Sequence, residues 1–588
     1  MQSALTRNVL LSLALLGFAL CARAEKISVS ISGIDKTLQA AVRDNLSASR
    51  YADRNDVSET QARVLADDAA KEAQMALRPY GYYNAHAESR LERIEGGAWQ
   101  VRLAVTPGPA AKVAMLDLQL PGPAAQLPPV RKAVRGFHPR AGETMQDSVY
   151  EASKGAIASA LIENGYLDAK ATEHRVEVTR AQDRADIHLH YAPGERYKLG
   201  AVNFEGSQFA PGFLQRYVPW QDGDWYTQSD LLALQQSLTD ADYFSIVNVE
   251  PQPAQAKDRV VPVKVEVAPA KRHVYTAGVF VGTDTGPGVR GSVRWRWLNS
   301  HGHKLSTEVI VAQRLKTAQA VYEIPQPGPD HRSFNFGVGF RDENTKTSLA
   351  HTFSLAANET RDWHGFVRTM GLHLVGGTFT VGASNGDVNV PGVEHGRSVL
   401  VYGEAALTKK VADNPLFVRH GWSLNLIGRA GPGIDTRFAQ ALADFKWIHA
   451  LGRRDRLILR GDAGATTVGD FSQLPPELRF FAGGDRSIRG YDYQAIGPRN
   501  SYNRVIGGTR LLVASAEVEH YFTRDWGMAA FVDSGDAFDG TAFHAQTGAG
   551  LGLRWRSPVG MVRVDVGVPI NNRYYHGAQL HIVIGPDL

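Results

Sequence analysis

The chain has 588 residues, of which 43% are hydrophobic and 21% are charged. This length exceeds that of one ordinary domain, and this composition excludes a broadly disordered chain. The basic excess is small and spread along the chain, 64 Lys and Arg against 60 Asp and Glu, so it gives no case for nucleic-acid binding.

Residues 1–24 have the features of a secretory signal peptide. Arg7 supplies the positive start, residues 9–20 supply the apolar segment, and residues 22–24 give the small-x-small cleavage site. Cleavage there removes Cys21, the one cysteine, which suits an envelope protein that is stabilised without disulfides. No later segment has about 18 uninterrupted apolar residues, so no transmembrane helix is expected.

Residues 25–268 contain a threefold repeat. Three helix-like stretches each run into a similar corner, at Gly81-Tyr82, Gly165-Tyr166 and Asp242-Tyr243. Glycine at such a corner takes the left-handed conformation that ends a helix, whereas aspartate tolerates it less well. Two strand-like runs and a Pro-containing exit follow each corner. The repeat predicts three small α+β modules in series, at 25–107, 108–193 and 194–268.

From about Lys271 onward, short alternating runs replace the helical pattern. Between residues 333 and 341 the apolar set is Phe334, Phe336, Val338 and Phe340, and the opposite set is Asn335, Gly337, Gly339 and Arg341. One face of these runs is thus apolar with aromatic ends, and the other is charged and rich in glycine. This pattern favours a transmembrane β-barrel over a soluble sandwich, and predicts the barrel at residues 269–588.

Sixteen strands are expected, an even number, as a single-chain bacterial barrel requires. They lie near 273–282, 289–297, 304–313, 317–324, 333–343, 348–357, 363–373, 397–408, 421–430, 439–450, 456–466, 508–521, 529–534, 546–556, 561–568 and 579–585. The glycines Gly548, Gly550 and Gly552 are expected to make room inside this barrel.

A long connection between the eleventh and twelfth strands, about Asp470 to Gly508, contains the triplet Arg489-Gly490-Tyr491. Arginine brings a fixed cation with five donors, glycine permits a backbone conformation closed to other residues, and tyrosine adds apolar surface. On its own the triplet is equally compatible with an exposed turn. The following strands, however, place carboxylates on the expected lumen face, at Glu517, Asp533 and Asp565. A partly buried ion pair inside the barrel is therefore expected.

Several motifs together resemble the BamA/TamA superfamily of outer-membrane assembly factors. They are IRGY at 488–491, FVDSG at 531–535, GLRWRSPVGMVRVDVGVPI at 552–570 and the closing QLHIVIGPDL. The three upstream modules resemble polypeptide-transport-associated (POTRA) domains, and their number favours the TamA branch, the outer-membrane subunit of the translocation and assembly module. Two positions depart from the family pattern. Asp242 stands where glycine is usual, and Leu588 replaces the phenylalanine common at outer-membrane C-termini.

The resemblance implies a structural role for the loop triplet. Arg489 would contact the lumen wall at Asp533, with Glu517 as second candidate, while Gly490 allows the turn and Tyr491 packs against the wall. It also implies a weak seam between the first strand and the C-terminal strand, with residues Ile582, Ile584, Gly585, Pro586 and Leu588. Proline lacks the amide hydrogen and glycine weakens strand order, so pairing there is expected to be short.

The resemblance further implies a function and partners. The chain would insert β-barrel clients such as autotransporters into the bacterial outer membrane without ATP, in contact with outer-membrane lipid, while residues 25–268 lie in the periplasm. A TamB-like protein anchored in the inner membrane would dock on residues 25–107. No cofactor, metal or enzymatic activity is expected.

Three alternatives stay open. A two-partner-type secretion pore shares the modules and the barrel, but usually has two modules and a plug helix. An outer-membrane hydrolase has only the G-x-S-x-G match around Ser384, with no helix expected after it. A passive porin explains neither the modules nor the Arg-Gly-Tyr loop.

Overall fold

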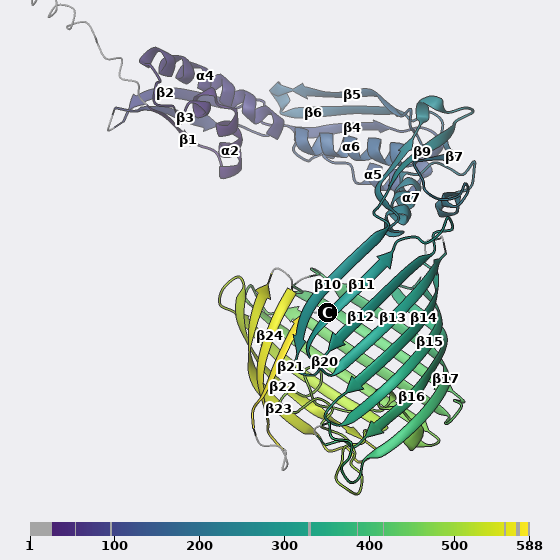
Figure 1. Cartoon of the computed structure of the whole chain (residues 1–588). Coiled ribbons are helices and arrows are strands. Elements are labelled where there is room, and N and C mark those ends of the chain that lie inside the picture. The colour runs from purple at the N-terminus through teal and green to yellow at the C-terminus, as the bar shows by residue number, and fades with distance from the viewer. Residues whose placement is uncertain are drawn as a thin grey trace, which may run out of the picture. The chain divides into compact units, whose positions relative to one another are not determined.

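The computed structural model describes residues 26–52, 54–94, 97–326, 328, 331–384, 386–415, 417–557, 560–571 and 577–585 (Figure 1). The expected signal peptide, Pro586 and Leu588 lie outside the described residues. The chain divides into two compact units, Met1–Ala201 with Trp220–Leu231 and Pro251–Val263, and Val202–Pro219 with Leu232–Glu250 and Lys264–Leu588. None of the helices in the described ranges is both long and apolar enough to cross a bilayer.

Three α+β modules precede the barrel, as predicted, and each has a three-stranded sheet whose last strand lies in the middle. The orders are β1-β3-β2, β4-β6-β5 and β7-β9-β8. The first module comprises β1 (Ile27–Ser32), α2 (Lys36–Asn45), α3 (Ser47–Arg50), α4 (Glu59–Leu77), β2 (His86–Arg93) and β3 (Trp99–Thr106). The second comprises β4 (Lys112–Gln119), α5 (Pro128–Arg135), α6 (Asp147–Glu163), β5 (Lys170–Thr179) and β6 (Arg184–Ala192). The third comprises β7 (Lys198–Glu205), α7 (Gln228–Asp240), β8 (Phe244–Pro251) and β9 (Val260–Pro269).

Period-2 alternation explains why the central strands form. In β3, the side chains of Trp99, Val101, Leu103 and Val105 are all buried, whereas the residues between them are more exposed. The buried set packs in one core with the apolar face of α4. One face of the sheet is therefore covered by helix, and the first module has a core of its own.

The three corners have the backbone conformation that their sequence predicts. The φ angles are +92° at Gly81, +90° at Gly165 and +57° at Asp242. The aspartate at the third corner also has a second role, because its carboxylate forms ion pairs with Arg296, whose Nε lies 3.0 Å away, and with Arg294, whose Nη2 lies 3.1 Å away. A glycine could supply the same φ angle but not these ion pairs, which explains the departure from the repeat.

The barrel is a single antiparallel sheet of sixteen strands in sequence order, as predicted (Figure 1). The strands are β10 (His273–Gly282), β11 (Gly286–Trp295), β12 (Lys304–Ala312), β13 (Leu315–Pro325), β14 (Ser333–Asn344), β15 (Ser348–Trp363), β16 (Phe366–Val381), β17 (Glu394–Ala412), β18 (His420–Gly431), β19 (Phe438–Ala450), β20 (Asp455–Val468), β21 (Arg510–Tyr521), β22 (Trp526–Phe538), β23 (Gln546–Ser557), β24 (Gly560–Pro569) and β25 (Gln579–Gly585). Most reach the roughly 9–11 residues that a tilted strand needs to cross a bilayer.

The two faces of the barrel wall differ in chemistry. In β22, Phe531 is buried, whereas its neighbour Val532 is 50% exposed. Phe336, Val338 and Phe340 of β14 are likewise about half exposed, as the apolar set of that strand predicts. The outer face is therefore a band of exposed apolar side chains, as a lipid-facing surface requires, while the inner face holds the polar residues.

The ion pairs at the third corner give a first prediction. Asp242→Asn keeps a side chain that tolerates a positive φ angle and removes the carboxylate charge. Because the groups are partly exposed, each pair should contribute less than about 1 kcal/mol, and the effect should fade at high salt. We expect faster protease cleavage between the third module and β10 in low salt, and cleavage near the wild-type rate in high salt.

The matched control is Asp258→Asn, since Asp258 also has a positive φ angle, +49°. Equal cleavage of the Asp242 variant, the control and the wild type in low salt would contradict a contribution from the ion pairs.

Candidate functional site

The connection between β20 and β21 folds into the barrel lumen, and we name residues 469–509 the lumen loop. Its apolar side chains pack against several parts of the wall. Ile488 and Tyr491 share a buried cluster with Val513 of β21 and Ala537 of β22. A second buried cluster joins loop residues to strands β16, β17 and β19, through Leu474, Leu478, Val375, Leu400, Tyr402 and Phe438. The lumen loop is thus held as a packed element.

Arg489 is buried at the tip of the lumen loop and binds three carboxylates of the wall. Its Nε and Nη2 donate to Asp533 at 2.8 and 2.9 Å, and its Nη1 donates to Glu517 at 2.6 Å and to Asp565 at 3.0 Å. The guanidinium carbon lies 3.5 Å from the ring centroid of Phe531. The planar guanidinium group thus binds the carboxylates through its edge and the aromatic ring through its face.

The network continues along the wall beyond Arg489. Arg554 of β23 donates to Glu517 at 2.6 Å and to Glu519 at 2.8 Å, and also binds Asp565. Arg456 of β20 forms an ion pair with the same Glu519. All of these side chains are at most 8% exposed. Three arginines and four carboxylates therefore alternate in one buried chain across β20–β24.

Burial determines what this network can do. Each charge has lost its water, so its stability depends on its partners, and removing one partner of a buried pair typically costs about 3–5 kcal/mol. Burial by itself would lower the pKa of Arg489, but its hydrogen bond to Asp533 and the nearby carboxylates raise that pKa above its usual value. The site is therefore built to hold a charged loop tip in place.

Gly490 lets the loop backbone reach the wall. Its φ angle is +97°, and a Cβ there would lie 2.9 Å from the carbonyl carbon of Val568. Two glycines of the barrel wall lie against the loop backbone at the same place. A Cβ at Gly548 would lie 1.9 Å from the Arg489 carbonyl oxygen, and one at Gly567 would lie 2.6 Å from the Gly490 nitrogen. The room that Gly548 was expected to make is occupied by the lumen loop.

Tyr491 is fully buried beside this glycine contact. Its hydroxyl group donates to the Thr547 carbonyl oxygen at 3.3 Å, so the ring is enclosed while its polar end has an acceptor. The structure thus brings together Arg489, Gly490 and Tyr491 with both of the wall partners expected from the sequence, Asp533 and Glu517.

The loop tip also contacts both ends of the barrel sheet. His581 of β25 binds Asp485 through Nδ1 at 2.6 Å and accepts from the Gly490 amide through Nε2 at 3.0 Å. Thr283, in the turn between β10 and β11, donates to the same Asp485. Because Nε2 accepts a hydrogen bond, the ring proton lies on Nδ1. The lumen loop therefore bridges the first and last strands.

Asp284, Asp485 and His581 also bring three potential metal ligands within 4.8 Å of one another. Both nitrogens of His581 are already used, by Asp485 and by the Gly490 amide. We therefore interpret the three residues as a hydrogen-bonded contact. Burial and the charge of Asp485 raise the pKa of Asp284 to about 7.

The hydrogen-bonded strand order ends at β10 on one side and β25 on the other. As described, β25 has seven residues and its register with β24 runs from Gln579 to Gly585. Across the seam, the Ile582 amide donates to Thr283 Oγ1 at 3.4 Å. Ile584 is 47% exposed. Of the seam residues expected from the sequence, Ile582, Ile584 and Gly585 lie in β25, and the other two lie outside the described residues.

The sequence analysis did not find four residues of the site, namely Arg456, Glu519 and Arg554 of the network and His581 at the seam. A signal existed for two of them. Glu519 follows Glu517 by two positions, and Arg554 follows Gly552 by two, so strand alternation places each on the lumen face with a residue already assigned to it. Arg456 and His581 lie near strand ends, where only the register between strands reveals their partners.

Gly490→Ala tests the close approach of the loop tip. The substitution forces a side chain into a positive φ angle, at about 1–3 kcal/mol, and adds an overlap with the β24 backbone. We expect the folded barrel to form while the lumen loop becomes accessible to protease. Gly540→Ala is the matched control, because Gly540 has φ +57° but a Cβ there meets no atom within 4 Å. Equal protection of the loop in both variants would contradict the packed tip.

Asp284→Asn tests the pH dependence of the seam contact. A carboxyl group whose pKa is raised from 3.8 to about 7 binds its proton more tightly in the folded state. Its contribution to stability is therefore greatest below 3.8 and declines as the pH rises to about 7. The asparagine variant should lose this decline and be more heat-resistant than wild type at pH 8. The measurement is the temperature at which the compact form converts to the unfolded form on SDS gels at pH 5 and pH 8. Parallel pH profiles for both proteins would refute this assignment.

Comparisons with known proteins agree with this architecture. Residues 301–587 match the Omp85 superfamily domain, residues 28–107 match the POTRA domain described as TamA domain 1, and residues 197–270 match the POTRA family described as a surface antigen variable number repeat. The crystal structure of BamA from Haemophilus ducreyi lacking POTRA domains 1–3 has a TM-score of 0.66 at 17% identity, and the match covers 80% of this chain and 99% of that one.

Curated relatives carry the name outer membrane protein assembly factor BamA. The protein from Nitratidesulfovibrio vulgaris is 24% identical over 571 residues, which cover 92% of this chain and 70% of the relative. The protein from Neorickettsia risticii is 22% identical over 411 residues, which cover 66% of this chain and 54% of the relative. With its barrel, its first module and its third module matched, the chain is an outer-membrane protein that has an Omp85 superfamily domain at residues 301–587 and POTRA domains in the periplasm.

Proposed function

We propose that the chain is a TamA-like assembly factor that inserts β-barrel clients, autotransporters among them, into the outer membrane through the seam between β10 and β25. The observation that carries the proposal is the end of the strand order at these two strands, one of which pairs over seven residues in the described part of the chain. An edge with few ladder hydrogen bonds is the part of a barrel that opens at least cost, and a free edge can pair with a client strand.

The lumen loop has a specific part in this proposal. The Arg489 network fixes the loop to β20–β24, while the contacts of Asp485 reach both strands of the seam. The loop therefore holds the closed seam from a rigid base, and the seam opens by breaking the contacts of Asp485 while Arg489 keeps its carboxylates. No covalent chemistry and no ATP enter this cycle. The energy of insertion comes from client strands that pair and bury apolar surface in the bilayer.

The TamA-like assignment implies a partner for the first module. The match of residues 28–107 to the description TamA domain 1 supports it. The module has two edge strands, β1 and β2, around the central β3, so each edge can accept an extended segment by β-augmentation. We propose that a TamB-like protein anchored in the inner membrane docks here and that unfolded outer-membrane proteins reach the barrel along this route.

A disulfide across the seam tests the mechanism. The Ile582 amide nitrogen and Thr283 Oγ1 lie 3.4 Å apart, so Thr283→Cys with Ile582→Cys places the two cysteines where the ends of the sheet meet, and non-reducing gels establish that the disulfide forms before the assay. The oxidised protein, reconstituted in liposomes, should insert an autotransporter client no faster than protein-free liposomes. Reduction should restore insertion.

The matched control is Val566→Cys with Leu580→Cys. These residues are register partners in β24 and β25, so their disulfide does not cross the seam. The control should insert the client at the wild-type rate in both redox states. Full activity of the oxidised Thr283–Ile582 variant would refute insertion through the seam and favour the alternative of a polypeptide secretion pore.

A further inference from the structure

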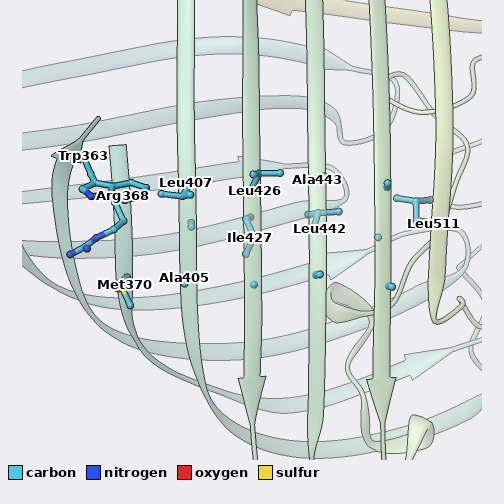
Figure 2. Close-up of a pocket in the computed structure, with 16 residues that line it drawn as sticks. Trp363, Arg368, Met370, Ala405, Leu407, Leu426, Ile427, Leu442, Ala443 and Leu511 are labelled. Atoms are coloured by element: carbon cyan, nitrogen blue, oxygen red, sulfur yellow. The ribbon is translucent and has the colours of Figure 1, made fainter. Parts of the chain in front are cut away.

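An apolar groove of about 760 Å³ lies on the outer face of the barrel, across β17–β20 (Figure 2). Its position on the outside follows from strand alternation. Glu404 of β17 and Arg429 of β18 form an ion pair in the lumen at 2.7 Å, so their neighbours Ala405 and Gly428 face outward. Met370 and Leu426, which also line the groove, are 46% and 38% exposed.

Small residues in adjacent register form the floor of this groove. Ala405 lies opposite Gly428, Gly428 opposite Ala441, and Ala441 opposite Ala465, while Ala443 lies opposite Ala463. Elsewhere on the outer face the corresponding positions carry large side chains, among them Val309, Phe336, Leu355, Leu372, Val532 and Leu551. The wall is therefore locally hollow where it faces hydrocarbon. A volume of this size lies in the range of about 300–1,000 Å³ that is typical of small-molecule sites.

One end of the groove is aromatic and cationic. Trp363, Arg368 and Met370 lie together at this end in Figure 2. Because β10 starts at the periplasmic modules and the strands alternate in direction, the hairpin between β15 and β16 lies at the periplasmic end. Lys409 also lies among aromatic side chains at the periplasmic end, since its Nζ lies 4.9 Å from the ring centroid of Phe366 and 5.7 Å from that of Trp422. We call these aromatic and cationic residues the aromatic girdle.

The arginines at this end outnumber the carboxylate that they share. Glu359 accepts from Arg332 Nε at 2.7 Å and from Arg368 Nη2 at 3.4 Å. Arg361 lies directly opposite Arg368 in the register of β15 and β16. In the part of the chain that the structure describes, the buried Nε atoms of Arg361 and Arg368 have no hydrogen-bond acceptor. Like charges opposite one another destabilise a sheet, so an anion between them is favoured.

We propose that the groove and its cationic end bind one phospholipid of the periplasmic leaflet with an anionic headgroup. An acyl chain lies over the floor of small residues and the phosphate accepts from Arg361 and Arg368, while Trp363 lies at the headgroup level. The apolar groove would hold the acyl chain, and the arginine donors would bind the phosphate. The aromatic girdle would lie at the membrane–water interface, as in other membrane proteins. The site lies away from the seam and does not rest on the proposed function.

Native mass spectrometry of the purified full-length chain tests the proposal, with dioleoyl phosphatidylglycerol as the probe. Wild type should bind one equivalent. Ala443→Phe fills the groove and should weaken binding roughly tenfold or more, because the acyl chain loses its contact area. Ala318→Phe is the matched control, since Ala318 is an exposed residue of β13 on the same outer face, opposite Val309. It should bind like wild type.

Arg361→Gln with Arg368→Gln should remove the preference for phosphatidylglycerol over phosphatidylcholine while the chain contacts remain. Heat-modifiable migration on SDS gels reports whether each variant folds, and Ala463→Leu replaces Ala443→Phe if the latter does not. Equal lipid binding by the groove-filled variant and its Ala318 control would overturn the proposal. Displacement of the lipid by inorganic phosphate alone, with no dependence on acyl chains, would overturn it as well.

Discussion

The buried guanidinium group of Arg489 is the constraint on which the rest of the barrel interior depends. Arginine keeps its charge at any relevant pH, and here it lies among Asp533, Glu517 and Asp565 with almost no access to solvent. If the loop tip left, these carboxylates would remain buried with too little positive charge to balance them. The position of the lumen loop, the glycines that admit its backbone and the order of β20–β24 all follow from this requirement.

A second consequence is an asymmetry between two parts of the same wall. The strands β20–β24 are tied by buried ion pairs that run from Arg456 to Asp565, whereas β25 adds, over its described residues, a seven-residue ladder and the contacts of His581. Both parts meet at the lumen loop, because Arg489 and Asp485 lie four residues apart. Forces that separate β25 from β10 therefore act on the weak contacts first, and the strong network stays intact.

Much of the fold could be predicted because successive residues of a barrel strand face lipid and lumen in turn, and apolar side chains suit the first and polar side chains the second. That alternation gave sixteen strands, and it placed Glu517 and Asp533 on the face where a tucked arginine would meet them. It could not reveal Arg456 or His581, whose partners depend on the register between distant strands. It also could not explain Asp242. The sequence presents a poorer corner residue, and only the approach of Arg294 and Arg296 shows what the carboxylate contributes.

The same limit applies to the outer groove. Alanines in β19 and β20 are unremarkable in sequence, and only register sets Ala441 beside Ala465. On the opposite face, Gly464 leaves space for the lumen loop, since a Cβ there would lie 2.4 Å from the ring of Phe480. This part of the wall therefore has small residues on its outer face and, at Gly464, on its inner face. Its inner surface is completed by the loop, which belongs to the chain, and in our proposal an acyl chain of the bilayer fills the outer surface in the same way.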